Sequence, residues 1–208
     1  TNIVTKPKYW NTAKKFLSKK DKVLKKIILT YKGSMTMRND PFFSLCKSII
    51  GQQISVQAAN SVWNKFELKA KKINPKNVLK LTRPQLSSCG LSRQKVEYLK
   101  NLATKFNTKA IDVRNLKTMD DETAIAYLTQ VKGIGRWTAQ MFLFFNQHRS
   151  DIFPIQDIGF LRAISKNYKT TYPPPIKKLD ALQKLWSPYA TVATWYLWRS
   201  IDPVPVKY

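Results

Sequence analysis

The stretch LTQVKGIGRWTAQMFL, residues 128–143, predicts a tight turn between two amphipathic helical segments. Gly133 and Gly135 bracket one apolar residue, Ile134, and glycines at this spacing let the backbone turn sharply and approach a ligand closely. Backbone N–H groups at the start of the second helix would bind an anion. Asp157 follows in FPIQDIGFLRAI. The pattern indicates a hairpin that grips phosphate groups, with chemistry at a nearby carboxylate.

The charge of the chain favours a polyanionic partner. Its 208 residues contain 37 Lys and Arg against 12 Asp and Glu, which gives a net charge of +25. Such a surface binds phosphate backbones without sequence preference, in a salt-dependent way. The alternative is a lysine-rich composition with no functional meaning. A membrane surface is less favoured as a partner, because the charge is spread along the chain rather than gathered on one amphipathic segment.

Several classes of site are excluded by composition. Cys46 and Cys89 are the two cysteines and lie in no CxxC or Cys/His pattern, so no disulfide framework, zinc site or iron–sulfur cluster is expected, and no metal bound by side chains. His148 is the single histidine and is expected at the surface, in the polar turn NQHRSD. The longest apolar runs, such as MFLFF, are too short to span a bilayer. Without a signal-peptide pattern, we expect an intracellular protein.

Helical patterns follow one another along the chain, and no alternating strand pattern is evident. A lysine-rich amphipathic segment runs from Tyr9 to Tyr31, Asp40 and Ser92 are predicted to cap helices, and Val56 opens an apolar face that continues to Phe66. We therefore predict an all-α fold, in which two helical lobes flank a DNA-binding cleft. A single domain, 1–208, is divided into lobe one (1–40 plus 150–208) and lobe two (41–149, with the hairpin at 128–143).

The motif L-x-x-V-x-G-I-G-R-W-T-A followed by P-x-x-D-I-G resembles the helix-hairpin-helix DNA glycosylase superfamily, and within it the alkyladenine branch of bacterial 3-methyladenine DNA glycosylase II. An isolated GxG hairpin would be a moderate signal, because non-catalytic DNA-binding modules share it. Four ordered segments make the resemblance more specific. The other three segments are SIIGQQIS (48–55), GLSRQKVEYL (90–99) and WSPYATVATWYLW (186–198).

The resemblance implies that Asp157 is the catalytic carboxylate. Ten of the twelve acids are predicted caps, lie on a helix surface or fall outside the similar segments, which leaves Asp151 and Asp157. The alternative for Asp157 is a helix cap alone, and both roles can coexist. The implied reaction cleaves an N-glycosidic bond through an oxocarbenium-like sugar, which a carboxylate stabilises while it orients water. Bifunctional relatives place a lysine where this chain has Trp137, so a monofunctional glycosylase without lyase activity is expected.

The resemblance also implies a pocket for the damaged base. Trp137 and Trp198 match pocket aromatics of the family, whose electron-rich faces attract a cationic methylated base. Each could instead be a core residue. Met141 stands where the best-known relative has tyrosine, so the base preference can differ. Among the other aromatic residues near the end of the chain, Trp186 and Trp195 are expected to be structural. For Tyr189 and Tyr196, the choice between pocket and core is left open.

Base flipping requires a side chain that fills the vacated space in the duplex. The family's wedge maps onto Gln53, for which the alternative is an ordinary loop glutamine. The hairpin is expected to contact the DNA backbone mainly through N–H groups. Similar hairpins also hold a monovalent cation through backbone carbonyls, and no other cofactor is expected. The expected backbone-contact positions are Lys132, Gly133, Ile134, Gly135 and Thr138.

The function that the resemblance implies is removal of 3-methyladenine and 7-methylguanine in base excision repair. Two alternatives remain: a glycosylase for ethenoadenine, hypoxanthine or oxidised bases, and a non-catalytic protein that binds damaged DNA. The expected partner is double-stranded DNA with a damaged base, bound by a monomer. The compartment would be the cytoplasm of a bacterium or the nucleus of a eukaryote.

Overall fold

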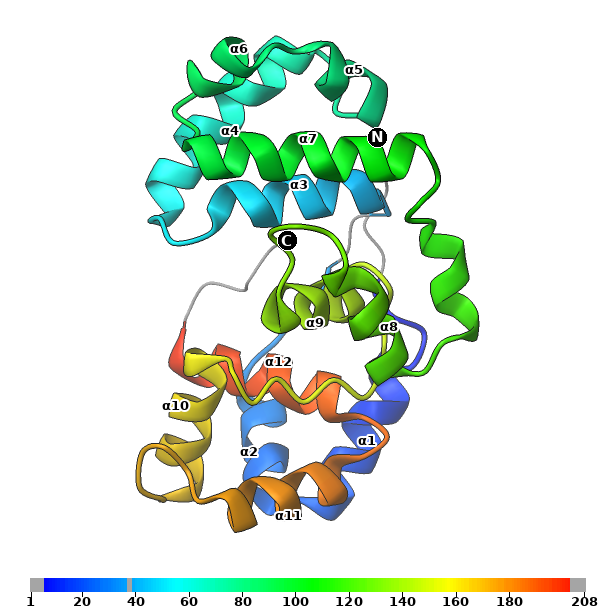
Figure 1. The fold of residues 1–208 in the computed structure, drawn as a ribbon. Helices are drawn as coiled ribbons and strands as arrows, with labels where there is room; N and C mark the ends of the chain where they lie inside the picture. The colour runs from blue at the N-terminus through cyan, green and yellow to red at the C-terminus, as the bar shows by residue number, and fades with distance from the viewer. Residues whose placement is uncertain (1–5, 37–38, 203–208) are drawn as a thin grey trace. The chain divides into compact units, whose positions relative to one another are not determined.

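The computed structural model describes residues 6–36 and 39–202, and its regular structure within these ranges is helical, without a strand (Figure 1). The predicted all-α class is confirmed. No helix in the described ranges has both the length and the apolar character needed to cross a membrane. The chain forms two compact units. One takes the described residues up to 36 and those from Leu143 onward, and the other runs from Asn39 to Phe142.

The first unit is built around its last helix. All residues from Ala190 to Trp198 are buried, and the four other helices of this unit contact that helix. Its sequence is apolar on nearly every side, which is typical of an enclosed helix. Trp10 packs edge-on against Trp195, with ring centroids 5.1 Å apart. The helices are α1 (Trp10–Lys20), α2 (Lys22–Thr30), α10 (Ile158–Tyr168), α11 (Ile176–Trp186) and α12 (Ala190–Ile201).

The lysine-rich segment predicted from Tyr9 to Tyr31 is two helices rather than one continuous run. Asp21 separates them, because its backbone is extended and its carboxylate accepts two N–H groups of the first turn of α2. The same carboxylate accepts hydrogen bonds from the hydroxyl of Tyr168 at 2.6 Å and the indole of Trp186 at 2.9 Å. A carboxylate that is only 6% exposed needs such donors. Asp21 therefore joins α2 to α10 and α11.

The second unit contains the predicted hairpin. The expected helix caps at Asp40 and Ser92 are confirmed, since each side chain accepts an N–H group of the first turn. Asp120 caps α8 in the same way. Val56 was predicted on a buried face, but it is 79% exposed. It opens its helix beside a loop, and burial begins only farther along, where other helices pack. The elements are α3 (Pro41–Gly51), α4 (Val56–Ala70), α5 (Pro75–Lys80), α6 (Arg83–Ser87), α7 (Arg93–Asn107), a 3₁₀ helix (Val113–Thr118), α8 (Asp121–Thr129) and the start of α9 (Arg136–Phe145).

Helix α7 supports two other helices by binding their last carbonyl groups. Carbonyl groups at a helix C-terminus have no partner inside the helix, and a cation there also interacts favourably with the helix dipole. Lys100 donates to the carbonyl of Leu79, at 3.0 Å, and to that of Leu81, at the end of α5. Lys95 does the same at the end of α3. Both lysines thereby fix neighbouring helix ends on α7.

Candidate functional site

Asp157 opens α10 and its carboxylate is held by two donors. One carboxylate oxygen, Oδ1, accepts the backbone N–H of Phe160 at 2.7 Å, which is a helix N-cap bond. The same oxygen accepts the indole Nε1–H of Trp198 at 2.9 Å. The capping role considered for Asp157 is thus present. A backbone donor and a side-chain donor converging on one oxygen fix the orientation of the half-buried carboxylate.

The indole that binds Asp157 is itself fixed by aromatic packing. Trp198 is 8% exposed and lies parallel to Phe145, with an interplanar angle of 8° and centroids 5.9 Å apart. Phe144 contacts the same ring at 5.1 Å. Glycine at position 159 makes room for the pair, because a Cβ there would lie 3.3 Å from Oδ1 of Asp157 and 3.7 Å from the indole. The packing of these rings therefore holds the indole of Trp198 in place for its hydrogen bond to Asp157.

The hairpin between α8 and α9 rests on α7. Gly133 has φ +87°, a conformation that other residues rarely adopt. A Cβ on Gly133 would also overlap the ring of Tyr98 in α7. Next to it, the backbone N–H of Lys132 donates to Oδ1 of Asn101, also in α7, at 3.3 Å. Glycine at position 133 is required both by the turn and by the close approach of α7.

Some backbone N–H groups of the hairpin donate hydrogen bonds within the protein. The N–H groups of Lys132 and Ile134 bond to acceptors in the chain. The helical bonding of α9 includes one from the N–H of Ala139 to the carbonyl of Gly135, at 3.0 Å. The N–H groups of the first turn of α9 therefore face its N-terminal end. The side chains of Ile134 and Thr138 are buried, so a ligand at these positions would meet backbone.

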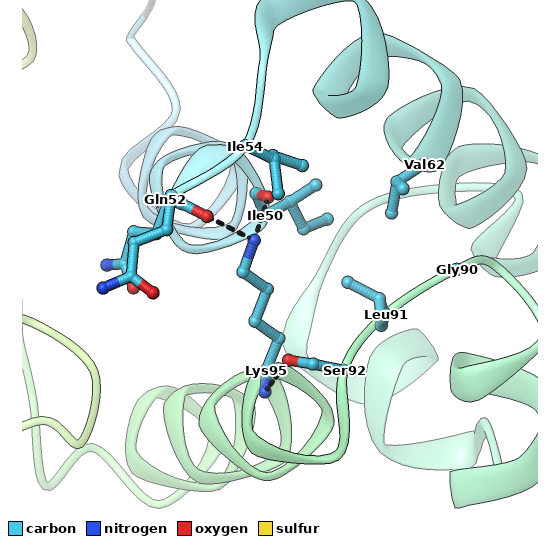
Figure 2. Close-up of a pocket in the computed structure, with 9 residues that line it drawn as sticks. Ile50, Gln52, Ile54, Val62, Gly90, Leu91, Ser92 and Lys95 are labelled. Atoms are coloured by element: carbon cyan, nitrogen blue, oxygen red, sulfur yellow. Dashed lines mark hydrogen bonds between the residues drawn. The ribbon is translucent and has the colours of Figure 1, made fainter.

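The turn that contains Gln53 is bonded to the hairpin. Gln53 is exposed and has φ +57°, while its neighbour Gln52 donates through Nε2 to the carbonyl of Gly133 at 2.7 Å. Figure 2 shows Lys95 reaching from α7 to two carbonyls at the end of α3. Gln53 and Lys95 line a pocket of about 200 Å³. The sequence pattern did not single out Gln52 or Lys95, although both lie in segments used for the resemblance.

The remaining predicted pocket residues lie on α9. Trp137 is half-buried in its first turn, and Met141, one turn later, is 2% exposed. Both belong to the second unit, whereas Asp157 and Trp198, which the structure brings into contact, belong to the first. The pocket roles of these residues stay predictions. In the described ranges, no group of three or more His, Cys, Asp and Glu side chains is arranged to hold a metal ion.

Asp151 and His148 are two further polar residues that the sequence analysis considered. Asp151, the other acid left by elimination, accepts the hydroxyl of Ser187 at 2.6 Å and the N–H of Ala190 at 3.1 Å, so it fastens the start of α12. His148 was expected at the surface but is half-buried in the turn after α9. Burial lowers the pKa of His148 below its ordinary value.

Comparison with known proteins gives consistent matches. The chain is 27% identical over 184 residues to DNA-3-methyladenine glycosylase 1 of Schizosaccharomyces pombe, covering 86% of this chain and 81% of that protein. The structure of the S. pombe 3-methyladenine DNA glycosylase in complex with abasic DNA matches with a TM-score of 0.78 and 25% identity, covering 95% of this chain and 100% of that one. A DNA-3-methyladenine glycosidase from Bacillus halodurans matches with a TM-score of 0.77 and 30% identity, covering 90% and 87%.

The family comparison agrees with these relatives. Residues 46–188 match the model described as HhH-GPD superfamily base excision DNA repair protein, and this range includes the hairpin and Asp157. The resemblance that the hairpin and its flanking segments predicted is confirmed. The chain belongs to the HhH-GPD superfamily of base excision DNA repair proteins.

Proposed function

We propose that the protein is a monofunctional DNA glycosylase that hydrolyses the N-glycosidic bond of alkylated bases, 3-methyladenine and 7-methylguanine, in double-stranded DNA. The carrying observation is the Asp157 carboxylate, which opens α10 with one oxygen held by Phe160 and Trp198. Relatives named 3-methyladenine glycosylases support the substrate class. Trp137, at the position where bifunctional relatives carry lysine, supports hydrolysis without lyase activity.

The chemistry follows from an oriented carboxylate. As the bond to the base breaks, positive charge develops on the sugar, and a fixed anion stabilises that charge without reorganising. The carboxylate also orients the water that attacks C1′. A methylated purine already carries positive charge and leaves as a neutral base, so little general-acid catalysis is needed. His148 is a poor proton donor at neutral pH, because its burial favours the uncharged imidazole.

We propose that the second unit binds the DNA and that the positive net charge of the chain strengthens this binding. The N-terminal end of α9 would receive a backbone phosphate, and Gln53 would enter the duplex in place of the flipped base. Trp137 and Met141 would contact the base through apolar and polarisable surface. We further propose that the hairpin carbonyls hold a monovalent cation and that a monomer binds the DNA. A binding isotherm measured in sodium, potassium and tetramethylammonium salts tests the cation.

The test is release of free base from methylated duplex DNA by wild type, Asp157→Asn and Asp151→Asn. Both substitutions remove one negative charge, but the Asp151 carboxylate bonds Ser187 and Ala190 at the start of α12, where no catalytic role is proposed. We expect release by wild type and Asp151→Asn and loss of release in Asp157→Asn. If every variant binds DNA and none releases base, the non-catalytic alternative is correct. A covalent adduct trapped with borohydride would contradict the absence of lyase activity.

A further inference from the structure

Lys95 holds the turn that follows α3. Its Nζ donates to the carbonyl of Ile50 at 2.7 Å and to that of Gln52 at 2.6 Å (Figure 2). These carbonyls belong to the last turn of α3 and to its C-cap, where the helix itself supplies no donors. The Lys95 side chain is half-buried, and burial lowers its pKa. Its ammonium group is thus committed to the turn rather than fully exposed to solvent.

The backbone of this turn needs support. Gln53 has φ +57°, which is in the left-handed region, where a residue other than glycine is strained. Such a conformation persists only when its surroundings fix it. Lys95 binds the carbonyl immediately before Gln53, and the Gln52 side chain donates to the carbonyl of Gly133 in the hairpin at 2.7 Å. The turn is therefore bonded on one side to α7 and on the other to the hairpin.

Helix α7 contacts the turn and the hairpin with residues three positions apart. Lys95 binds the turn, Tyr98 packs against Gly133, and Asn101 accepts the N–H of Lys132. Residues at this spacing lie on neighbouring positions of a helix surface. One rigid helix thus sets the position of the Gln53 turn relative to the hairpin, and both lie within the same compact unit.

We propose that Lys95 is a positioning residue for base flipping: it holds the Gln53 turn in the conformation that enters the duplex, in register with the phosphate-binding hairpin. The inference rests on the proposed function and on Gln53 as the wedge. Lys95 touches no reacting atom in this scheme. It lowers the free energy of extruding the base and leaves cleavage of the glycosidic bond unchanged.

The first test compares base release from two substrates that differ only in how firmly the lesion is held. One duplex carries 7-methylguanine paired with cytosine, and the other carries it opposite a tetrahydrofuran residue, where flipping is easier. For Lys95→Met we expect the single-turnover rate of release to fall about tenfold or more on the paired substrate. On the unpaired substrate the rate should stay within about threefold of wild type. The expected loss corresponds to one or more hydrogen bonds of the turn. Lys105→Met, on the same helix, removes an equal charge and should leave both rates unchanged.

Equal loss on both substrates would refute the proposal, because it would place Lys95 in bond cleavage or in general stability. Coupling to Gln53 gives a second criterion. If both residues act through one turn, Lys95→Met combined with Gln53→Ala is no slower on the paired substrate than the slower single variant. Multiplicative losses would show that the two act independently. Gln52→Ala, which removes the bond to Gly133, should show the same substrate-selective loss and replaces Lys95→Met if that variant fails to fold.

A measurement without base release separates this inference from the proposed function. A duplex with 2-aminopurine beside a tetrahydrofuran residue should gain fluorescence when wild type enters the duplex. Lys95→Met should bind this duplex within about threefold of Lys105→Met, since each lacks one charge, yet give less than half the fluorescence gain. An unchanged gain overturns the role of Lys95. Wild type that gives the gain but releases no 7-methylguanine refutes only the glycosylase activity.

Discussion

Substitution of Trp198 by phenylalanine should slow the reaction without abolishing the fold. The change removes the indole N–H that donates to Asp157 at 2.9 Å and keeps an aromatic ring beside Phe145. A hydrogen bond to a charged group contributes about 1.5–3 kcal/mol. If the whole amount is lost from the transition state, the rate falls about 10- to 150-fold, since about 1.4 kcal/mol is a factor of ten. Single-turnover release of 7-methylguanine at saturating enzyme measures this rate directly.

The first unit provides a matched control in Trp186→Phe. Trp186 also donates from its indole to a carboxylate at 2.9 Å, but that carboxylate is Asp21, which caps α2. Both substitutions therefore remove the same kind of bond, and each should lower Tm by roughly 3–12 °C in a chain of this length. Only Trp198→Phe should lower the release rate of folded enzyme. A wild-type rate in Trp198→Phe, or an equal loss in Trp186→Phe, would refute the orientation of Asp157 by Trp198.

Two further predictions concern the hairpin and the single histidine. Gly133→Ala should destabilise the protein by about 2–4 kcal/mol, because alanine would be held at φ +87° and its Cβ would overlap the ring of Tyr98. In Gly135→Ala the Cβ meets nothing within 4 Å, so this control should change the urea midpoint far less. Burial lowers the pKa of His148 below 6.5, so the unfolded chain binds the proton more tightly and stability should fall as pH drops below about 6.5. His148→Asn, which tolerates φ +59°, should flatten that loss in urea unfolding between pH 7.5 and 5.5, and an unchanged slope would contradict it.

The helical class and many helix starts are predictable because they depend on short-range chemistry. Asp40 and Ser92 cap helices as expected, since a side chain that accepts its own helix's N–H groups needs no distant partner. The break at Asp21 was not predicted, although it too is a cap. Its burial depends on Tyr168 and Trp186, which are more than 140 residues away in the chain. Periodicity alone cannot show which part of an apolar face is covered, as exposed Val56 illustrates.

The candidate site divides in the same way. The hairpin glycines and the capping aspartate carry local signals, because a turn and a helix start each restrict the residue at one position. The bonds from Lys95 and Gln52 carry none. From sequence alone, a lysine in an amphipathic helix is expected to be a solvent-exposed charge, and a glutamine after a helix is expected to be an ordinary loop residue. Only the packing of α7 beside α3 and the hairpin gives these two side chains their carbonyl partners.

The catalytic role proposed for Asp157 is compatible with its role as a helix cap. A helix N-cap must be an acceptor with a fixed direction, and a group that stabilises developing positive charge must be an anion with a fixed direction. Asp157 meets both conditions through the same oxygen, which Phe160 and Trp198 bind together. Replacing it with asparagine keeps an acceptor for the helix and removes the charge. The stability of Asp157→Asn should therefore remain close to that of wild type while base release is lost, which separates the two roles in one variant.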